Sequence, residues 1–162
     1  MTRSIVALFE HSLWANLRLL DAGEGLGEEQ LSAGCAGTYG SVRDTLVHTF
    51  ASEARYVREL TAGASEATLS EDGPFPGFPA LRKHATTSGE ALIGLAGEMP
   101  EEHVLRGEYR GRPYEMPASL MFAQAINHAT EHRAHIATIL SQQGVEPPRM
   151  DAMGYFTAGA RA

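Results

Sequence analysis

The chain of 162 residues has a single cysteine, Cys35, so it cannot form an internal disulfide. The sequence therefore gives no sign of an oxidising compartment. It also lacks any run of about 18 or more apolar residues, so no transmembrane helix is predicted. Residues 1–20 lack the long apolar core and the small-residue cleavage site of a signal peptide. Together these absences predict a cytoplasmic protein.

Clustered basic residues are absent as well. The chain has 13 Lys and Arg against 20 Asp and Glu, which gives a formal net charge of −7. Because nucleic-acid backbones and anionic membrane surfaces attract clustered Lys and Arg, we expect neither as a partner. The 43% hydrophobic and 20% charged residues are typical of a globular domain. We therefore expect one domain spanning residues 1–162, with a small molecule as its partner.

Apolar residues recur with helical periodicity in four segments, which Gly- and Pro-rich stretches separate. The predicted helices span about 4–22, 41–60, 79–99 and 117–143. Ser41 is a good N-cap, with Asp44 three residues later, and Gly144 ends the last helix. Residues 104–117 contain two short strand-like runs, which predict an extended excursion or a small hairpin. The expected fold class is all-α: a four-helix bundle with a short extended excursion between its third and fourth helices.

The stretch "NHATEHRAHI" concentrates three of the seven histidines in the fourth predicted helix: His128, His132 and His135. They share the face that also carries apolar residues, so we expect them to point inward. His128 and His132 are four residues apart, and this spacing allows both to bind one metal ion. His135 is two turns from His128, so the three do not easily reach one centre. The spacing favours a metal site and a polar core network equally.

A metal site with two ligands on one helix needs a third from a facing helix. His48 lies midway along the second predicted helix, among small residues that leave space for a ligand. Glu53 points near the centre of that helix's apolar stripe, where a carboxylate is costly unless it is paired. We expect Glu53 to orient a ligand histidine or to be a structural partner, in preference to binding metal itself.

Three stretches together resemble the DinB-like superfamily of metal-binding four-helix bundles: "WAN" at 14–16, "GSVRDTLVHTFASE" at 40–53 and "INHATEHRAHIATILSQQG" at 126–144. The ending "MDAMGYF" is also similar to that of the family. The resemblance implies that His48, His128 and His132 are the metal ligands. It implies that His135, which replaces a common glutamine, is not a primary ligand, although it can reach a water on the metal. His11 replaces a residue that is often aromatic, and it points either into the cleft or into ordinary packing.

Three neutral histidines leave positions open on a divalent ion, and imidazole suits both zinc and nickel. Open positions favour a metal-dependent enzyme. One predicted activity is hydrolysis, with Glu53 or His135 moving the proton. The other, which the resemblance favours, is the transfer of a low-molecular-weight thiol to an electrophile. The alternative is a metal-binding stress-response protein without turnover.

The first predicted helix carries a second apolar row beside its core stripe: Val6, Leu13, Leu17 and Leu20. An apolar face this wide often meets a partner helix. Together with the family resemblance, this row predicts a homodimer. The alternative is a helix that is deeply buried in its own chain.

Overall fold

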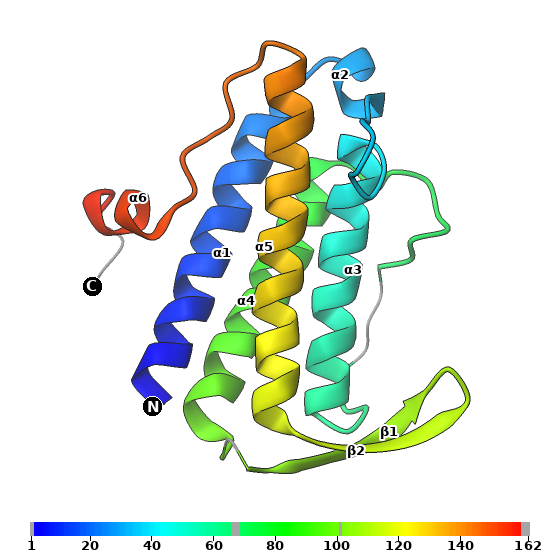
Figure 1. Ribbon diagram of the computed structural model, residues 1–162, viewed down its shortest axis with the longest axis vertical. Coiled ribbons are helices and arrows are strands. Elements are labelled where there is room, and N and C mark those ends of the chain that lie inside the picture. Colours follow the sequence, from blue (N-terminus) through cyan, green and yellow to red (C-terminus); the bar gives the residue numbers. More distant parts are fainter. Residues whose placement is uncertain (1, 66–68, 101, 160–162) are drawn as a thin grey trace.

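The computed structural model describes residues 2–65, 69–100 and 102–159. Four long helices run along one another in this part of the chain: α1 (Thr2–Glu24), α3 (Val42–Leu60), α4 (Phe78–Glu98) and α5 (Ala118–Gln142) (Figure 1). Both α1 and α3 pack against α4 and α5. Two short helices, α2 (Glu28–Ser32) and α6 (Ala152–Thr157), complete the helical elements described. The prediction of a mainly helical chain is confirmed.

Capping explains where α3 begins. The hydroxyl of Ser41 accepts a hydrogen bond from the backbone N–H of Asp44 at 3.1 Å, and the Asp44 carboxylate accepts one from the backbone N–H of Ser41 at 3.3 Å. This reciprocal pair satisfies two of the N–H groups that a helix start leaves without partners. At the other end of the sequence, Gly144 follows α5 with a φ of 72°, a conformation that favours glycine. Both predicted helix boundaries are confirmed.

The excursion between α4 and α5 is a paired antiparallel hairpin, so the all-α expectation needs correction. Its strands are β1 (Val104–Tyr109) and β2 (Arg112–Pro117). The connecting residues Arg110 and Gly111 both have positive φ, as the tight turns that match strand twist require. Leu105 is buried in the core, and Figure 1 shows the hairpin crossing the ends of α3 and α5.

The buried apolar residues form two clusters, one toward each end of the long helices. The first contains residues such as Leu20, Phe50 and Ile139, and the second residues such as Phe9, Leu92 and Phe122. Six of the buried polar residues fall between the two clusters along each helix: Ser12, Asn16, Glu53, Ser88, His132 and Arg133. The helices therefore enclose a polar layer at mid-height, and the histidines of α5 belong to this level.

The second apolar row of α1 packs inside the chain. Leu20 is fully buried, and Leu17 and Val6 lie against the two core clusters. Leu13 contacts α4 at Gly89. This row therefore matches the alternative of a deeply buried helix, and the homodimer stays a prediction that rests on other surfaces.

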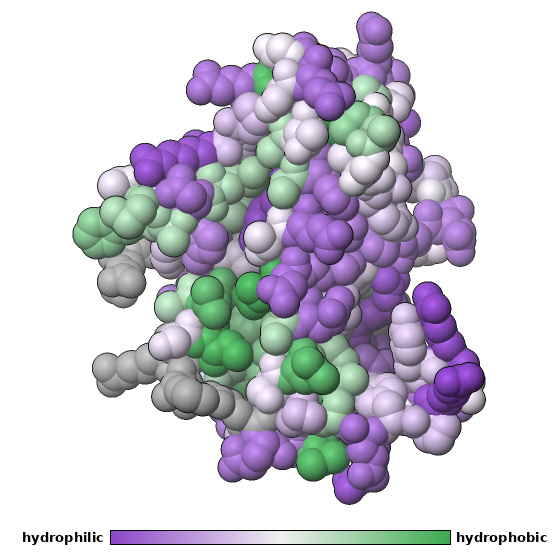
Figure 2. All heavy atoms as spheres, in the orientation of Figure 1, coloured by the Kyte–Doolittle hydropathy of each residue, from purple (hydrophilic) through white to green (hydrophobic). Residues whose placement is uncertain are grey.

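On the face of the molecule drawn in Figure 2, hydrophobic side chains gather over the lower halves of α1 and α5, and hydrophilic ones cover most of the rest. Leu8 of α1 and Leu120 of α5 are 49% and 55% exposed. None of the helices that the structure describes has the length and apolarity needed to cross a membrane.

Candidate metal centre

Three histidine rings converge between α3 and α5, from positions 48, 128 and 132. The Nε2 atom of His128 lies 3.1 Å from Nε2 of His48 and 3.1 Å from Nε2 of His132. One ring nitrogen from each residue lies within 4.8 Å of the other two. His132 is buried and the other two are half-buried. The structure thus brings together the three residues assigned as ligands from the sequence.

The contacts among these nitrogens fit a bound cation. A ring nitrogen carries one hydrogen or one lone pair, so Nε2 of His128 can make a normal hydrogen bond to only one of its two close neighbours. Nδ1 of His48 lies 2.5 Å from an oxygen of Glu71. Because a carboxylate only accepts hydrogen bonds, that nitrogen carries the hydrogen, and a neutral His48 has its lone pair on Nε2. A cation satisfies all three nitrogens at once, and three imidazoles are a donor set that suits zinc or nickel.

Electrostatics keep the α5 pair neutral. Burial first, and then the neighbouring His132 and His48, lower the pKa of His128 to about 4. The pKa of His132 is also lowered to about 4, by burial first and then by His48 and His135. Neutral imidazole is the form that binds metal. At neutral pH both side chains therefore have the protonation state that a metal site needs.

Three side chains hold His48 in place. Glu71, in the connector before α4, accepts the hydrogen bond from His48 and also pairs with Arg55. Burial alone would raise the pKa of Glu71, but the hydrogen bonds from His48 and Arg55 outweigh it and lower that pKa. The ring of Tyr39 stacks on His48 with centroids 3.9 Å apart, and its hydroxyl donates to Glu71 at 3.3 Å. These contacts fix which nitrogen of His48 faces the other two histidines.

Sequence reasoning missed Glu71, Tyr39 and Arg55. A metal-binding histidine usually donates a hydrogen bond from its second ring nitrogen to a carboxylate. This rule predicts an acidic partner for His48 but does not say which acidic residue it is. The connector "SEDGPFPG" has no periodicity that shows which of its acidic residues turns inward.

Glu53 is a structural partner in the polar layer. Its carboxylate accepts hydrogen bonds from Asn16 at 2.8 Å and from Ser88 at 3.0 Å. Burial raises the pKa of Glu53, and the hydrogen bonds from Ser88 and Asn16 and the charge of Arg133 act in the opposite direction. Arg133 donates to Ser12 and to Asn16. The network joins all four long helices, and among the described residues none of its hydrogen bonds reaches the three histidines. These contacts match the structural role expected from the sequence and give no support to Glu53 as an orienting group or a proton carrier.

His135 lies beside the three-histidine cluster. Its ring packs edge-on against that of His132, with centroids 5.3 Å apart. Its Nε2 atom lies 4.0 Å from an oxygen of Glu131, one turn earlier on α5. The side chain is 21% exposed, so it connects the neighbourhood of the cluster with the surface.

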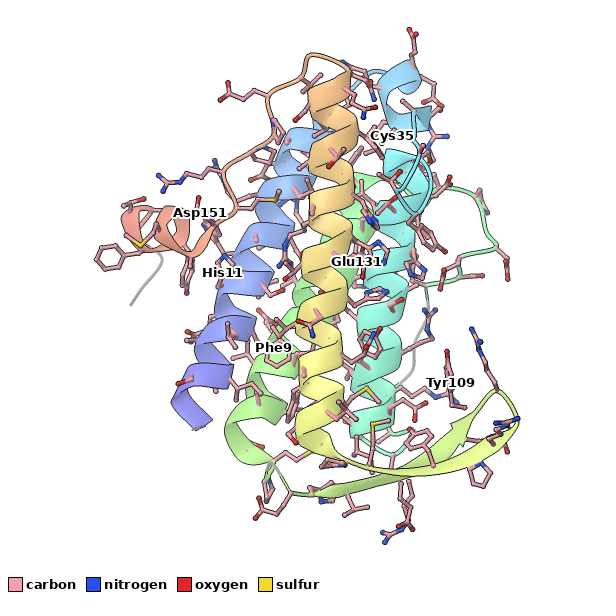
Figure 3. All side chains as sticks on the ribbon, viewed as in Figure 1. Phe9, His11, Cys35, Tyr109, Glu131 and Asp151 are labelled. Atoms are coloured by element: carbon pink, nitrogen blue, oxygen red, sulfur yellow. The ribbon has the colours of Figure 1, made fainter. Side chains whose placement is uncertain are left out.

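His11 has a different place. Its Nε2 atom donates to the backbone carbonyl of Met150 at 2.8 Å, and its ring contacts Trp14 and Tyr155. Figure 3 shows His11 on α1 on the side where the segment of Asp151 returns toward α1. His11 thus attaches the C-terminal segment to α1, in agreement with the packing role among the two alternatives.

Comparisons with known proteins agree with the fold. A sequence model described as the DinB family matches residues 1–160. The fold is similar to the crystal structure of a DinB-like protein from Bacillus cereus ATCC 10987, with a TM-score of 0.64 and 19% sequence identity. That similarity covers 86% of this chain and 90% of the other. A comparison with curated proteins finds no match.

Proposed function

The chain belongs to the DinB family, and from this premise we propose that it is a divalent-metal-dependent enzyme, which transfers a low-molecular-weight thiol to an electrophile or hydrolyses its substrate. The convergence of three Nε2 atoms from two helices carries the proposal. A structural zinc site closes with four protein ligands. Among the described residues, the cluster of candidate ligands has three members. Three ligands leave room for a substrate atom.

A bound zinc or nickel ion would supply a Lewis acid that makes a thiol or a water more acidic. The chain's own residues then position the ligands and carry the proton. Glu71 and Tyr39 hold His48. His135 is the better placed of the two proposed proton acceptors, because Glu53 is engaged with Asn16 and Ser88. From His135 the proton can pass toward Glu131 and the solvent. We place the activity in the cytoplasm, where such thiols are kept reduced.

Metal analysis tests the site. Protein purified without added metal, and then loaded with zinc or nickel, should hold about one ion per chain, since open three-histidine sites bind one ion. The His48→Ala variant should lose most of the bound metal, because its two remaining ligands come from one helix and make a weak site. His103→Ala is the matched control, since that histidine is exposed and lies outside the cluster. Equal metal content in His48→Ala and the parent protein would contradict the site.

Two assays separate the reactions. In the first, metal-loaded protein is mixed with a bacterial low-molecular-weight thiol and monochlorobimane. We expect the parent protein to consume the thiol and the His48→Ala variant not to consume it. In the second, ester cleavage is measured without any thiol. Ester cleavage alone would select the hydrolase. If neither reaction occurs at any metal loading, the proposal of an enzyme is refuted. The alternative of a metal-binding protein without turnover would then stand.

A further inference from the structure

A cavity of about 500 Å³ lies between the hairpin and the adjoining ends of α3 and α5. Its volume is within the range of small-ligand sites. The apolar part of its wall consists of three aromatic rings, two thioethers and one leucine: Tyr56, Tyr109, Tyr114, Met116, Leu120 and Met121. Figure 3 shows Tyr109 on the hairpin, on the side toward α3. The wall therefore offers flat and polarisable surfaces to a ligand.

Three residues of the cavity wall lead toward the metal centre. The ring of Tyr56 packs edge-on against that of His128, with centroids 5.6 Å apart. Gln124, one helical turn before His128 on α5, also lines the cavity and donates to the Tyr56 hydroxyl at 3.3 Å. Arg55 lines the cavity as well and pairs with Glu71, which holds His48. At this end of the cavity, the wall residue Tyr56 lies against His128, so a ligand here lies beside the metal centre.

The polar part of the wall disfavours anions. It carries the carboxylates of Glu59 and Glu108. The guanidinium of Arg55 is engaged with Glu71 and with the hydroxyl of Ser52. Tyr114 donates to Glu59 at 2.6 Å, and burial together with this hydrogen bond raises the pKa of Tyr114 to about 12, so it stays neutral. Because like charges repel, these two carboxylates favour a neutral ligand over an anion.

From these observations we propose that the cavity binds the neutral aromatic part of the electrophilic substrate and directs its reacting end toward the three histidines. The inference rests on the proposed function, because it needs a reaction at that centre. It adds a substrate class, neutral aromatic electrophiles, and a second subsite about one helical turn from the metal ligands.

A pair of ligands of equal shape tests the cavity without turnover. Zinc-loaded protein with ¹³C-methyl methionine is titrated with naphthalene-2-carboxamide, which is neutral, and with naphthalene-2-carboxylate, which is an anion. We expect saturable shifts of the Met116 and Met121 signals with the amide, at least about tenfold tighter than with the carboxylate. Met150 and Met153, which do not line the cavity, should not respond. Equal affinities, or shifts confined to Met150 and Met153, would overturn the proposal.

Two exposed leucines supply matched variants. Leu120→Ser removes part of the wall and should weaken binding of the amide about tenfold, as expected for losing one leucine contact. Leu8→Ser, on α1 and outside the cavity, should leave the affinity unchanged. Equal affinity of both variants would show that the ligand binds elsewhere.

Cobalt tests the link to the metal centre. In protein loaded with Co²⁺, a paramagnetic ion, we expect the proton signals of the bound amide to broaden beyond those seen with Zn²⁺. Equal line widths would overturn the placement beside the centre. The proposed function and the proposed subsite fail in different ways. If the methionine signals shift but neither reaction occurs, the proposed enzyme is refuted. If a reaction occurs but the methionine signals do not shift, the proposed subsite is refuted.

Discussion

Nδ1 of His48 lies 2.5 Å from a carboxylate oxygen of Glu71, although the two residues are 23 positions apart in the sequence. The bond joins α3 to the connector before α4. It fixes the hydrogen on Nδ1 and so leaves Nε2 to face His128. One carboxylate outside the cluster thereby determines how the cross-helix ligand is presented.

Glu71→Gln should weaken metal binding about 10- to 100-fold, the usual cost of losing the carboxylate partner of a ligand histidine. The amide keeps the size of the side chain but removes its charge. Competition with a chelating dye measures the affinity. Asp72→Asn makes the same change at the neighbouring exposed position and should leave the affinity unchanged. Equal affinities for Glu71→Gln and the parent protein would show that Glu71 does not support the site.

Glu53→Ala should lower the free energy of unfolding by about 3–5 kcal/mol, the typical cost of breaking a buried charged network. It removes the acceptor of Asn16 and Ser88 and leaves the buried Arg133 without its opposing charge. Urea denaturation of the metal-free protein measures the change. Glu90→Ala, at an exposed position of α4, should stay within about 0.5 kcal/mol of the parent. If Glu53→Ala changed the free energy of unfolding as little as Glu90→Ala, the structural role of Glu53 would be contradicted, and proton transfer would remain among its expected roles.

The long helices could be predicted because their signals are local. Ser41 and Asp44 mark a helix start within four residues, and apolar periodicity repeats over the whole of each long helix. The five residues of α2 are too few for a period to appear, and they lie in a glycine-rich stretch that indicates a break. The hairpin was foreseen only as an alternative, because pairing joins two runs whose individual patterns are weak.

The candidate site also has a part that local sequence signals predict and a part that they do not. The spacing of His128 and His132 places them on one face of one helix, which follows from helix geometry alone. Spacing left a metal site and a polar network equally favoured. The position of His48 among small residues made it the candidate third ligand, and the family resemblance implied the full set of three. Glu71 and Tyr39 could not be predicted, because both belong to connectors whose path depends on the packed helices.

Asp151 should titrate with a pKa of about 2. Hydrogen bonds from Arg149 first, and then from the backbone N–H of Gly154, lower the pKa of this cap of α6. Because the folded-state pKa is depressed, the stabilisation it reports is present above the unfolded-state value and is lost as the pH falls through about 2. The carboxyl ¹³C signal and the amide signals of Met153 and Gly154 follow the titration. A midpoint near the unperturbed value of 3.8 would contradict these bonds.

Light scattering tests the homodimer. The chain has a mass of 17.4 kDa, and we expect a particle of twice that mass in solution. The exposed Leu8 lies on α1, one of the two helices whose lower halves carry the hydrophobic face in Figure 2. Large apolar faces favour association. A monomer mass at micromolar concentration would refute the dimer.

Two glycines of α4 should respond to the same substitution with opposite signs. A Cβ on Gly89 would lie 2.7 Å from Cδ1 and 3.2 Å from Cβ of Leu13, so α1 and α4 approach too closely for a side chain there. Gly89→Ala should lower the free energy of unfolding by about 1–3 kcal/mol, because overpacking displaces the neighbouring helix.

Gly94→Ala is the matched variant. Gly94 is exposed, and a Cβ there meets nothing within 4 Å. Alanine should therefore raise the free energy of unfolding by about 0.5–1 kcal/mol, since it restricts the unfolded chain and favours the helix. Urea denaturation of both variants gives the comparison. If Gly89→Ala were as stable as Gly94→Ala, the close packing of α1 on α4 through Leu13 would be refuted.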